Sequence, residues 1–249
     1  MALSILKTKQ NKFQYSELPE DPIQHTVNPI CTGSSVIGIK FKGGIIVGCD
    51  DLISYGSMAK FKKTKRIEKL AEHTVMASSG EFSDFQELLK KLKTMRDTDM
   101  QKNDGIIYTP KEYGNYVARI QYYRRCKVNP YLLNNVVAGY TKEGGAYLAK
   151  IDQFGTYIEH DYVTTGFAGY LGAPIIENES KPDQDENAAR QILIKCFTNL
   201  FYRDCRASDT IQLAVITDAG VKFEEPFRIE GVWNYKKYAQ DGSEFYFRQ

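Results

Sequence analysis

Two adjacent hydroxyl residues follow a glycine near the first apolar run of the chain. The stretch reads Thr-Gly-Ser-Ser-Val and spans Thr32 to Val36. A hydroxyl group that opens a buried strand is either a nucleophile that cleavage of the chain would free or the trace of a former nucleophile. Most Gly-Ser-Ser sequences simply begin a strand or form hydrogen bonds within a turn. Taken alone, this motif leaves both a catalytic and a structural Ser34 open.

The other patterns that could carry chemistry are weaker. The sequence lacks the Gly-x4-Gly-Lys-Ser/Thr loop that binds phosphates. Gly166, Gly169 and Gly172 recur at every third residue, which favours helix packing or turns over a dinucleotide fingerprint. The basic stretch from Tyr123 to Lys127 stands at a predicted helix end, where cations complement the helix dipole. A solvated helix end is favoured there over nucleic-acid binding.

Cysteines and histidines indicate neither a disulfide framework nor a metal site. The five cysteines are scattered, odd in number and mostly inside apolar stretches, which predicts buried thiols in a reducing compartment. The three histidines lie far apart and form no ligand-spaced cluster with the cysteines. We therefore predict no metal and no cofactor. The cysteines are Cys31, Cys49, Cys126, Cys196 and Cys205.

Composition is ordinary for a soluble globular protein of one or two domains. The 249 residues are 42% hydrophobic, and the net charge of +2 gives no general reason to expect nucleic-acid or membrane binding. No apolar run approaches the roughly 18 residues that a membrane span needs. The polar first 29 residues lack the apolar centre of a secretory signal. We expect an intracellular, soluble protein.

The elements that would position Ser34 begin with strands. Residues 35–42 alternate between apolar and polar positions, and residues 45–47 are continuously apolar, so the two predict a hairpin around Gly43 and Gly44. Further strand-like sequence continues to about residue 77.

Two helices are predicted next. Apolar residues recur at three- and four-residue spacing from Phe82 to Met95, with Ser78 and Glu81 as a possible capping box and residues 97–105 as the loop that ends the helix. The second helix has a stronger start signal, with Thr109 as cap, Pro110 in the first position and Glu112 reaching back. Its apolar stripe is Tyr113, Tyr116, Val117, Ile120 and Tyr123.

Strands return at residues 132–140, 146–151 and 156–158, and a clear helical period covers residues 189–201. Two last strands close the pattern, at 211–217 and 221–227. Blocks of strands separated by helix pairs predict an α+β fold, with two antiparallel sheets packed on each other and helices covering both outer faces.

From about Thr26 onward, nearly the whole chain resembles the beta subunits of the 20S proteasome core. Within that family it is most similar to a beta type regarded as lacking proteolytic activity. The resemblance implies the four-layer αββα sandwich of the N-terminal nucleophile hydrolase class. It rests on these motifs in this order: TGSSVIGIKFKGGIIVGCDD, SYGSMAKFKKTKRIEKL, VMASSGEFSDFQELLKKL, QYYRRCKVNPYLLNNVVAGY, TTGFAGYLGAP and FYRDCRASD.

The resemblance implies which positions matter for catalysis. The family uses a threonine made N-terminal by self-cleavage after a glycine, with its free amine as general base. Gly33 matches that glycine, and Ser34 stands where the nucleophile is expected. Asp50 matches an aspartate that holds a lysine, Gly80 the glycine whose backbone N–H receives the oxyanion, and Asp204 a second aspartate.

Three departures from the family pattern predict an inactive site. Arg66 replaces the lysine, Phe167 replaces a serine, and Ala207 followed by Ser208 replaces a Ser-Gly pair. A guanidinium keeps its proton, and because it is planar and longer than an ammonium we expect that it cannot fit a compact pocket. Phe167 would add bulk where a small group orients the amine. We therefore predict no catalytic residue, with Ser34 capping the first strand and still peptide-bonded to Gly33.

The resemblance also predicts how the chain is organised. Residues 1–25 are expected to be a propeptide removed between His25 and Thr26, residues 26–229 the proteasome beta-type domain, and residues 230–249 a tail that contacts neighbouring subunits. The tail anchors would be aromatic: Trp233, Tyr235, Tyr238, Phe245, Tyr246 and Phe247.

The implied function is that of a non-catalytic structural subunit, in the cytoplasm and nucleus, of a particle that degrades proteins in an ATP- and ubiquitin-dependent way. The implied partners are beta subunits of the same and the opposite ring, alpha-ring subunits and assembly chaperones, without nucleic acid or membrane. One alternative is an active hydrolase that uses Ser34. A weaker one is a homomeric protease of the bacterial kind, which would need an intact nucleophile in every copy.

Overall fold

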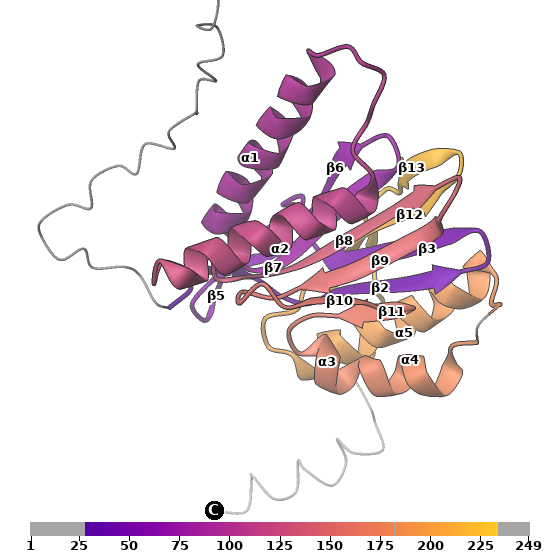
Figure 1. Cartoon of the computed structure of the whole chain (residues 1–249). Coiled ribbons are helices and arrows are strands. Elements are labelled where there is room, and N and C mark those ends of the chain that lie inside the picture. The colour runs from indigo at the N-terminus through magenta and orange to yellow at the C-terminus, as the bar shows by residue number, and fades with distance from the viewer. Residues whose placement is uncertain (1–27, 182, 234–249) are drawn as a thin grey trace, which may run out of the picture.

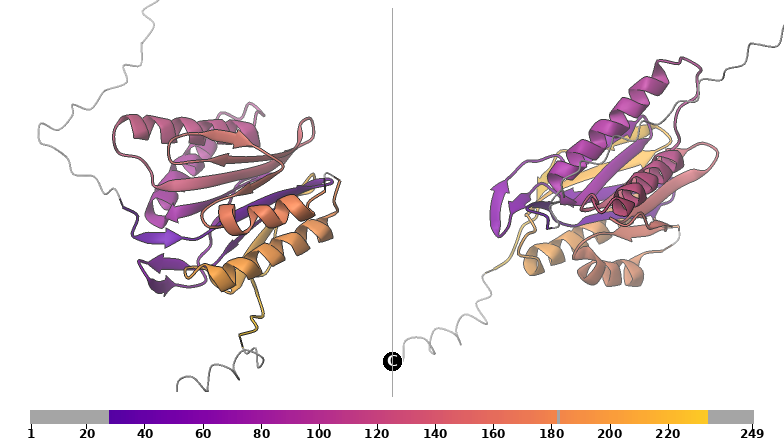
Figure 2. Two further views of the ribbon diagram at one scale, coloured as in Figure 1. Left: turned by 90° about the horizontal axis from the view of Figure 1, so that it is seen from below. Right: turned by 60° about the vertical axis from the view of Figure 1, so that its left-hand side comes forward.

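Two antiparallel β-sheets lie face to face in the computed structural model, which describes residues 28–181 and 183–233 (Figure 1). Helices α1 (Phe82–Met100) and α2 (Pro110–Cys126) cover the outer face of the larger sheet. Helices α3 (Ala168–Leu171), α4 (Ala173–Glu179) and α5 (Glu186–Arg203) cover the outer face of the smaller one. Figure 2 shows the resulting four layers from two further directions. The predicted αββα sandwich is confirmed.

The larger sheet has the strand order β10-β9-β8-β7-β1-β4-β5, with β6 paired to β7. The short strand β1 therefore lies inside the sheet, between β7 and β4. The bounds are β1 Cys31–Gly33, β4 Ile53–Tyr55, β5 Met58–Phe61, β6 Ile67–Ala71, β7 Thr74–Glu81, β8 Leu133–Thr141, β9 Gly145–Ile151 and β10 Tyr157–Glu159.

The smaller sheet has the order β11-β2-β3-β12-β13, with β14 paired to β12. The predicted first hairpin is β2–β3, and Gly43 in its turn has a φ of +94°, a conformation that L side chains rarely adopt. The bounds are β2 Val36–Phe41, β3 Gly44–Asp50, β11 Tyr162–Thr164, β12 Thr210–Thr217, β13 Gly220–Phe223 and β14 Phe227–Arg228.

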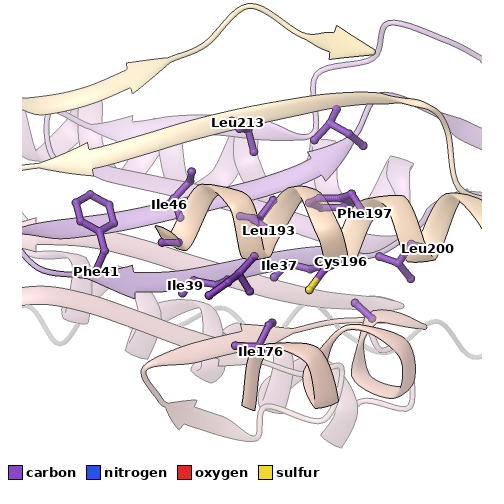
Figure 3. Close-up of a cluster of buried hydrophobic side chains, with 14 of the residues drawn as sticks. Ile37, Ile39, Phe41, Ile46, Ile176, Leu193, Cys196, Phe197, Leu200 and Leu213 are labelled. Carbon is purple, nitrogen blue, oxygen red and sulfur yellow. The ribbon is translucent and has the colours of Figure 1, made fainter. Parts of the chain in front are cut away.

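Three hydrophobic clusters hold the layers together. One lies between the sheets and includes Val47, Val75 and Ala214. A second packs α1 and α2 on the larger sheet. The third packs α5 and α4 on the smaller sheet, and Figure 3 shows Leu193 and Phe197 of α5 among its members. Successive residues of a strand point to opposite faces of the sheet, so neighbours such as Val36 and Ile37 of β2 belong to different clusters.

The cap predicted for α2 is confirmed, whereas the one predicted for α1 is wrong. The Glu112 N–H donates to Thr109 Oγ1 at 3.3 Å, and the Thr109 N–H donates to Glu112 Oε2 at 2.6 Å. Ser78 instead lies within β7, and its hydroxyl donates to the Asn134 carbonyl. Glu81 occupies the position before α1 but makes no side-chain capping bond.

Two further expectations need correction. Helix α1 continues to Met100, so the first part of the predicted loop is helical. In the predicted stripe of α2, Tyr113 and Val117 are buried, but Tyr116 and Tyr123 are exposed because the outer side of α2 faces away from the sheet.

The expectation of buried thiols holds for only some cysteines. Cys49 and Cys196 are buried, and burial raises the pKa of each thiol to about 12. Cys126 and Cys205 are exposed, since Cys126 is the last residue of α2 and Cys205 follows the end of α5.

Candidate active site

Strand β1 ends at Gly33, the residue before the candidate nucleophile. Gly33 lies opposite Ile53 of β4 on one side and opposite Gly80 of β7 on the other. The carbonyl that self-cleavage would attack therefore belongs to a residue held inside the larger sheet. Ser34 follows directly, between β1 and the start of β2.

The N-terminal side of β1 is fixed by a carboxylate that the sequence interpretation assigned to a helix cap. Glu81 Oε2 accepts the backbone N–H of Ile30 at 2.6 Å and that of Cys31 at 3.1 Å. Its other carboxylate oxygen accepts the Ser83 hydroxyl at 3.0 Å. Glu81 therefore ties the segment before Gly33 to β7. The sequence signal that could have indicated this role is the position of Glu81 directly after Gly80, at the end of β7.

Ser34 lies beside a buried ion pair. Its hydroxyl donates to Asp50 Oδ1 at 2.8 Å. The Arg66 guanidinium binds the same oxygen through Nη1 and donates through Nη2 to the carbonyl oxygens of Ser34, at 2.5 Å, and Ser78, at 3.1 Å. Asp50 and Arg66 are each 1% exposed. The three residues thus form one hydrogen-bonded group in the interior.

The expectation that an arginine cannot fit this pocket is wrong. Arg66 is among the largest fully buried side chains in the described part of the chain. Space for it exists because residue 33 has no side chain: a Cβ built on Gly33 would lie 2.5 Å from Arg66 Nε and 2.8 Å from Arg66 Cζ. The fit is incomplete in its hydrogen bonds, since Nε is buried without a partner among the described residues.

Burial raises the pKa of the Asp50 carboxyl above its usual range, and the Arg66 guanidinium gives the largest opposing effect. Hydrogen bonds from the Ser208 N–H, at 3.0 Å to Oδ2, and from the Ser34 hydroxyl also oppose the rise. Both carboxylate oxygens are therefore occupied by donors. A further proton on Asp50 would therefore have to displace one of these hydrogen bonds.

The structure brings some of the predicted site residues together. Ser208 belongs to the group, because its N–H binds Asp50 and its hydroxyl donates to Asp51 Oδ1 at 3.0 Å. Gly80 lies across from Gly33 with a φ of +106°, and a Cβ there would lie 2.2 Å from the Leu132 carbonyl oxygen, so this position requires glycine.

Other predicted residues serve different contacts. Asp204 Oδ1 accepts the Arg206 N–H at 2.9 Å, and Arg206 in turn donates to the Thr32 hydroxyl at 3.4 Å. Ala207 packs at the border of the α5 cluster. Phe167 is 58% exposed, with its ring 6.5 Å from that of Tyr170. The bulk of Phe167 thus points to the surface rather than into the pocket.

Gln212 is a site residue that sequence reasoning missed. Its Oε1 accepts the Arg66 backbone N–H at 3.2 Å, and its Nε2 donates to the Thr64 carbonyl at 2.6 Å. These bonds hold the segment that carries Arg66 against β12. A polar residue within the otherwise apolar run of β12 was the signal that could have indicated it.

The remaining expectations concern metals, membranes and the termini. Within residues 28–181 and 183–233, no group of three or more His, Cys, Asp or Glu side chains could hold a metal ion. In the same part of the chain, each helix is too short or too polar to cross a membrane. The predicted propeptide, residues 1–25, and tail residues 234–249 lie outside the described residues. Of the expected tail anchors, Trp233 is described, and its ring stacks edge-on against Phe201 and Tyr202 of α5.

Comparisons with known proteins agree with this geometry. Residues 30–216 match the family model described as proteasome subunit. A proteasome subunit beta type-4 of Xenopus laevis is 37% identical over 214 residues, which cover 85% of this chain and 88% of that protein. The beta type-4 subunit of Arabidopsis thaliana is 36% identical over 222 residues, which cover 89% of this chain and 90% of that protein. The beta type-7 subunit of Saccharomyces cerevisiae is 31% identical over 235 residues, which cover 90% of this chain and 88% of that protein.

Two of these relatives carry the name beta type-4 and one the name beta type-7, and both names agree with the resemblance to a proteasome beta subunit. The family match covers the larger sheet, all five described helices and the smaller sheet apart from the last residue of β12 and strands β13 and β14. The chain belongs to the proteasome subunit family.

Proposed function

We propose that this chain is a non-catalytic structural beta subunit of the 20S proteasome core. The observation that carries the proposal is the buried pair of Asp50 and Arg66 on the Ser34 hydroxyl and carbonyl. A guanidinium stays protonated at any relevant pH, so it cannot accept the nucleophile's proton and return it. The Asp50 oxygens are already engaged by Arg66 and Ser208. The site can position Ser34 but lacks a free general base.

The position of β1 supports the same proposal. If Ser34 attacked a peptide, the carbonyl under attack would have to lie where the Gly33 carbonyl lies now. That place is filled by the chain's own strand, paired with β4 and β7 and fixed by Glu81. A chain that keeps the bond between Gly33 and Ser34 leaves no space there for an extended substrate.

A second candidate function is an active hydrolase that uses Ser34. The contact that favours it is the 2.8 Å hydrogen bond from Ser34 Oγ to Asp50, since a carboxylate can act as general base. Arg66 on the same oxygen weakens this candidate, because it opposes the rise in the Asp50 pKa that burial causes and because a proton from Ser34 would have to displace it.

One experiment separates the two candidates. Intact particles would be treated with an epoxyketone or boronate inhibitor, and this chain would then be analysed by mass spectrometry. The structural-subunit proposal expects no adduct on Ser34 and a continuous peptide across residues 33 and 34. An adduct on Ser34 together with a new amino terminus at that residue would establish the active hydrolase instead. Labelled active subunits of the same particle serve as the positive control.

Residues 1–25 are proposed to be a propeptide that neighbouring subunits remove between His25 and Thr26, leaving 26–229 as the folded domain. N-terminal sequencing of the chain from mature particles tests this. A sequence that begins with Thr26 is expected, and one that begins at Met1 or Ser34 would refute the assignment.

Residues 230–249 are proposed to be a tail that reaches the opposite beta ring. The stacking of Trp233 on Phe201 and Tyr202 supports a fixed starting point for such a tail. Deletion of residues 231–249 should make half-particles accumulate. Full particles at the wild-type level would contradict the strap role.

The proposed partners follow from family membership. They are beta subunits of the same and the opposite ring, alpha-ring subunits and assembly chaperones, in the cytoplasm and nucleus. In this setting the chain contributes to ATP- and ubiquitin-dependent degradation through the particle as a whole. Ring formation uses heterologous contacts between unlike neighbours.

A further inference from the structure

Val128 has a backbone conformation that β-branched residues rarely adopt. It is the second residue after α2, and its φ is +54°. In the left-handed region an L residue's Cβ crowds the carbonyl oxygen, which is why glycine or asparagine usually follows a helix at this position. The Val128 side chain is 78% exposed. The chain thus keeps a strained valine where its side chain is largely in solvent.

The turn itself does not depend on the valine side chain. The Val128 N–H donates to the Arg125 carbonyl at 3.0 Å, and the Asn129 N–H donates to the Arg124 carbonyl at 3.1 Å. Arg124 Nε returns a bond to the Asn129 carbonyl at 3.0 Å. Asparagine or glycine at position 128 could make the same backbone bonds with less strain. The backbone bonds of this turn therefore give no reason for valine at position 128.

Exposed aromatic rings accompany Val128 at the end of α2. Tyr122 is 55% exposed and Tyr123 is 60% exposed. We call Tyr122, Tyr123 and Val128 the α2-end surface. In Figure 1 this end of α2 lies at the periphery of the ribbon, beyond the strands that the helix crosses. Tyrosine is enriched in protein–protein contacts, and the two exposed rings beside an aliphatic side chain fit a contact of this kind.

The charges of the sequence segment that carries the α2-end surface have one sign, while Glu87 of α1 lines the same hollow as Tyr123. The sequence contains no Asp or Glu between Glu112 and Glu143, whereas Arg125 and Lys127 lie within it. The Arg125 guanidinium lies over the Tyr122 ring, 5.8 Å from its centroid, and Lys127 Nζ lies 5.7 Å from that of Tyr123. Neither cation takes part in an ion pair found among the described residues. Carboxylates on a partner surface would complement these two cations.

We propose that the α2-end surface binds a neighbouring subunit of the particle, with Val128 inserted into an apolar recess whose border carries Asp or Glu side chains. The proposal rests on the proposed function, because it requires assembly with other subunits. An aliphatic side chain at the centre favours protein over nucleic acid as the partner, since nucleic-acid contacts are dominated by phosphate.

The test uses opposite effects of one substitution on stability and on assembly. Val128→Asn should relieve strain and raise the melting temperature of the full-length chain by about 2–4 °C. In cells that express equal amounts of wild-type and variant chain, its share of assembled particles should fall about fivefold or more. Lys63→Asn is the matched control, because Lys63 is exposed and has a φ of +61°. It should also raise the melting temperature but leave incorporation unchanged.

Each other outcome overturns a specific claim. Equal incorporation of Val128→Asn and Lys63→Asn would overturn the interface while leaving the proposed function intact. An unchanged melting temperature for Val128→Asn would remove the strain argument and with it the inference. If the wild-type chain itself fails to enter particles, the proposed function fails as well.

The charged border is tested separately with Arg125→Glu combined with Lys127→Glu, against Lys142→Glu in the exposed β8–β9 turn. The double reversal should reduce incorporation, with Lys142→Glu unchanged. If the double reversal abolishes binding of a single-stranded oligonucleotide to intact particles while incorporation stays normal, nucleic acid is the partner and the proposal is wrong.

Discussion

The Arg66 guanidinium occupies the space that a side chain on Gly33 would need. A Cβ on residue 33 would lie 2.5 Å from Nε and 2.9 Å from Nη2. The glycine at position 33 therefore has a packing role. It makes room for the cation that holds Asp50 and the Ser34 carbonyl.

Gly33→Ala should destabilise the chain by about 2 kcal/mol, because overpacking a well-filled interior displaces either β1 or the Arg66 side chain. Urea unfolding of the full-length chain measures the change. Gly169→Ala is the matched control, since the nearest atom to its Cβ would be Thr164 Oγ1 at 3.9 Å. A neutral Gly33→Ala would contradict the packing role.

Replacing either member of the buried ion pair of Asp50 and Arg66 should destabilise the folded chain. Asp50→Asn leaves Arg66 buried without a charged partner, and Arg66→Met leaves Asp50 without its cation, so each should lower the free energy of unfolding by about 3–5 kcal/mol. The double variant should lose clearly less than the sum of the two, with a coupling of about 2 kcal/mol. A thermodynamic cycle from urea unfolding gives the coupling. Strictly additive losses would show that the two side chains do not stabilise each other.

Glu81→Gln should loosen the segment before Gly33. The substitution replaces charge-assisted bonds to the Ile30 and Cys31 N–H groups by weaker neutral ones. Amide hydrogen exchange at these two residues should become about tenfold faster, which corresponds to about 1.4 kcal/mol. Glu143→Gln in the exposed β8–β9 turn is the control and should leave both rates unchanged. Unaltered exchange in Glu81→Gln would mean that pairing with β4 and β7 is sufficient.

The pair of Arg190 on α5 and Glu224 after β13 should make stability depend on acid pH. Hydrogen bonds from Arg190 lower the pKa of Glu224 below its usual value of 4.5. A carboxyl whose pKa is lowered in the folded state contributes its full stabilisation above about pH 4.5, and this is lost as the pH falls through the folded-state pKa. We expect about 1 kcal/mol from this partly exposed pair.

The measurement compares wild type with Glu224→Gln between pH 3 and 7. The difference in unfolding free energy should be present at neutral pH and should shrink below about pH 4.5. A difference that stays constant over this range would show that Glu224 titrates normally in the folded chain.

The spacing of apolar residues predicted most helices and strands, because it shows which residues lie on the buried face of an element. Ile37, Ile39 and Phe41 alternate along β2, and Leu193, Phe197 and Leu200 repeat along α5, so each pattern was visible within one element. The cap at Thr109 was equally local. Ser78 was misassigned because the same residue types that begin a helix also occur in a strand. Only the pairing of β7 with β8 decides between them.

The site depends on contacts between distant parts of the sequence, which explains what could not be predicted. The resemblance gave the identities of Asp50, Arg66 and Ser208, but Ser208 lies 158 positions from the Asp50 carboxylate that it binds. That Arg66 fits depends on the missing side chain of Gly33 in a neighbouring strand. Phe167 was expected in the pocket because alignment fixes a residue's place in the chain, not the direction of its side chain.

Strand β1 also connects two parts of the larger sheet. Among the described strands, β4 pairs with β1 and β5 alone, so β1 is the link between the β4–β5 hairpin and the other strands of that sheet. A chain that is never cut after Gly33 retains this link from translation onward. Under the proposed function, its β4–β5 hairpin would have its final shape before any proteolytic maturation and would serve as a fixed template while neighbouring subunits are still being processed.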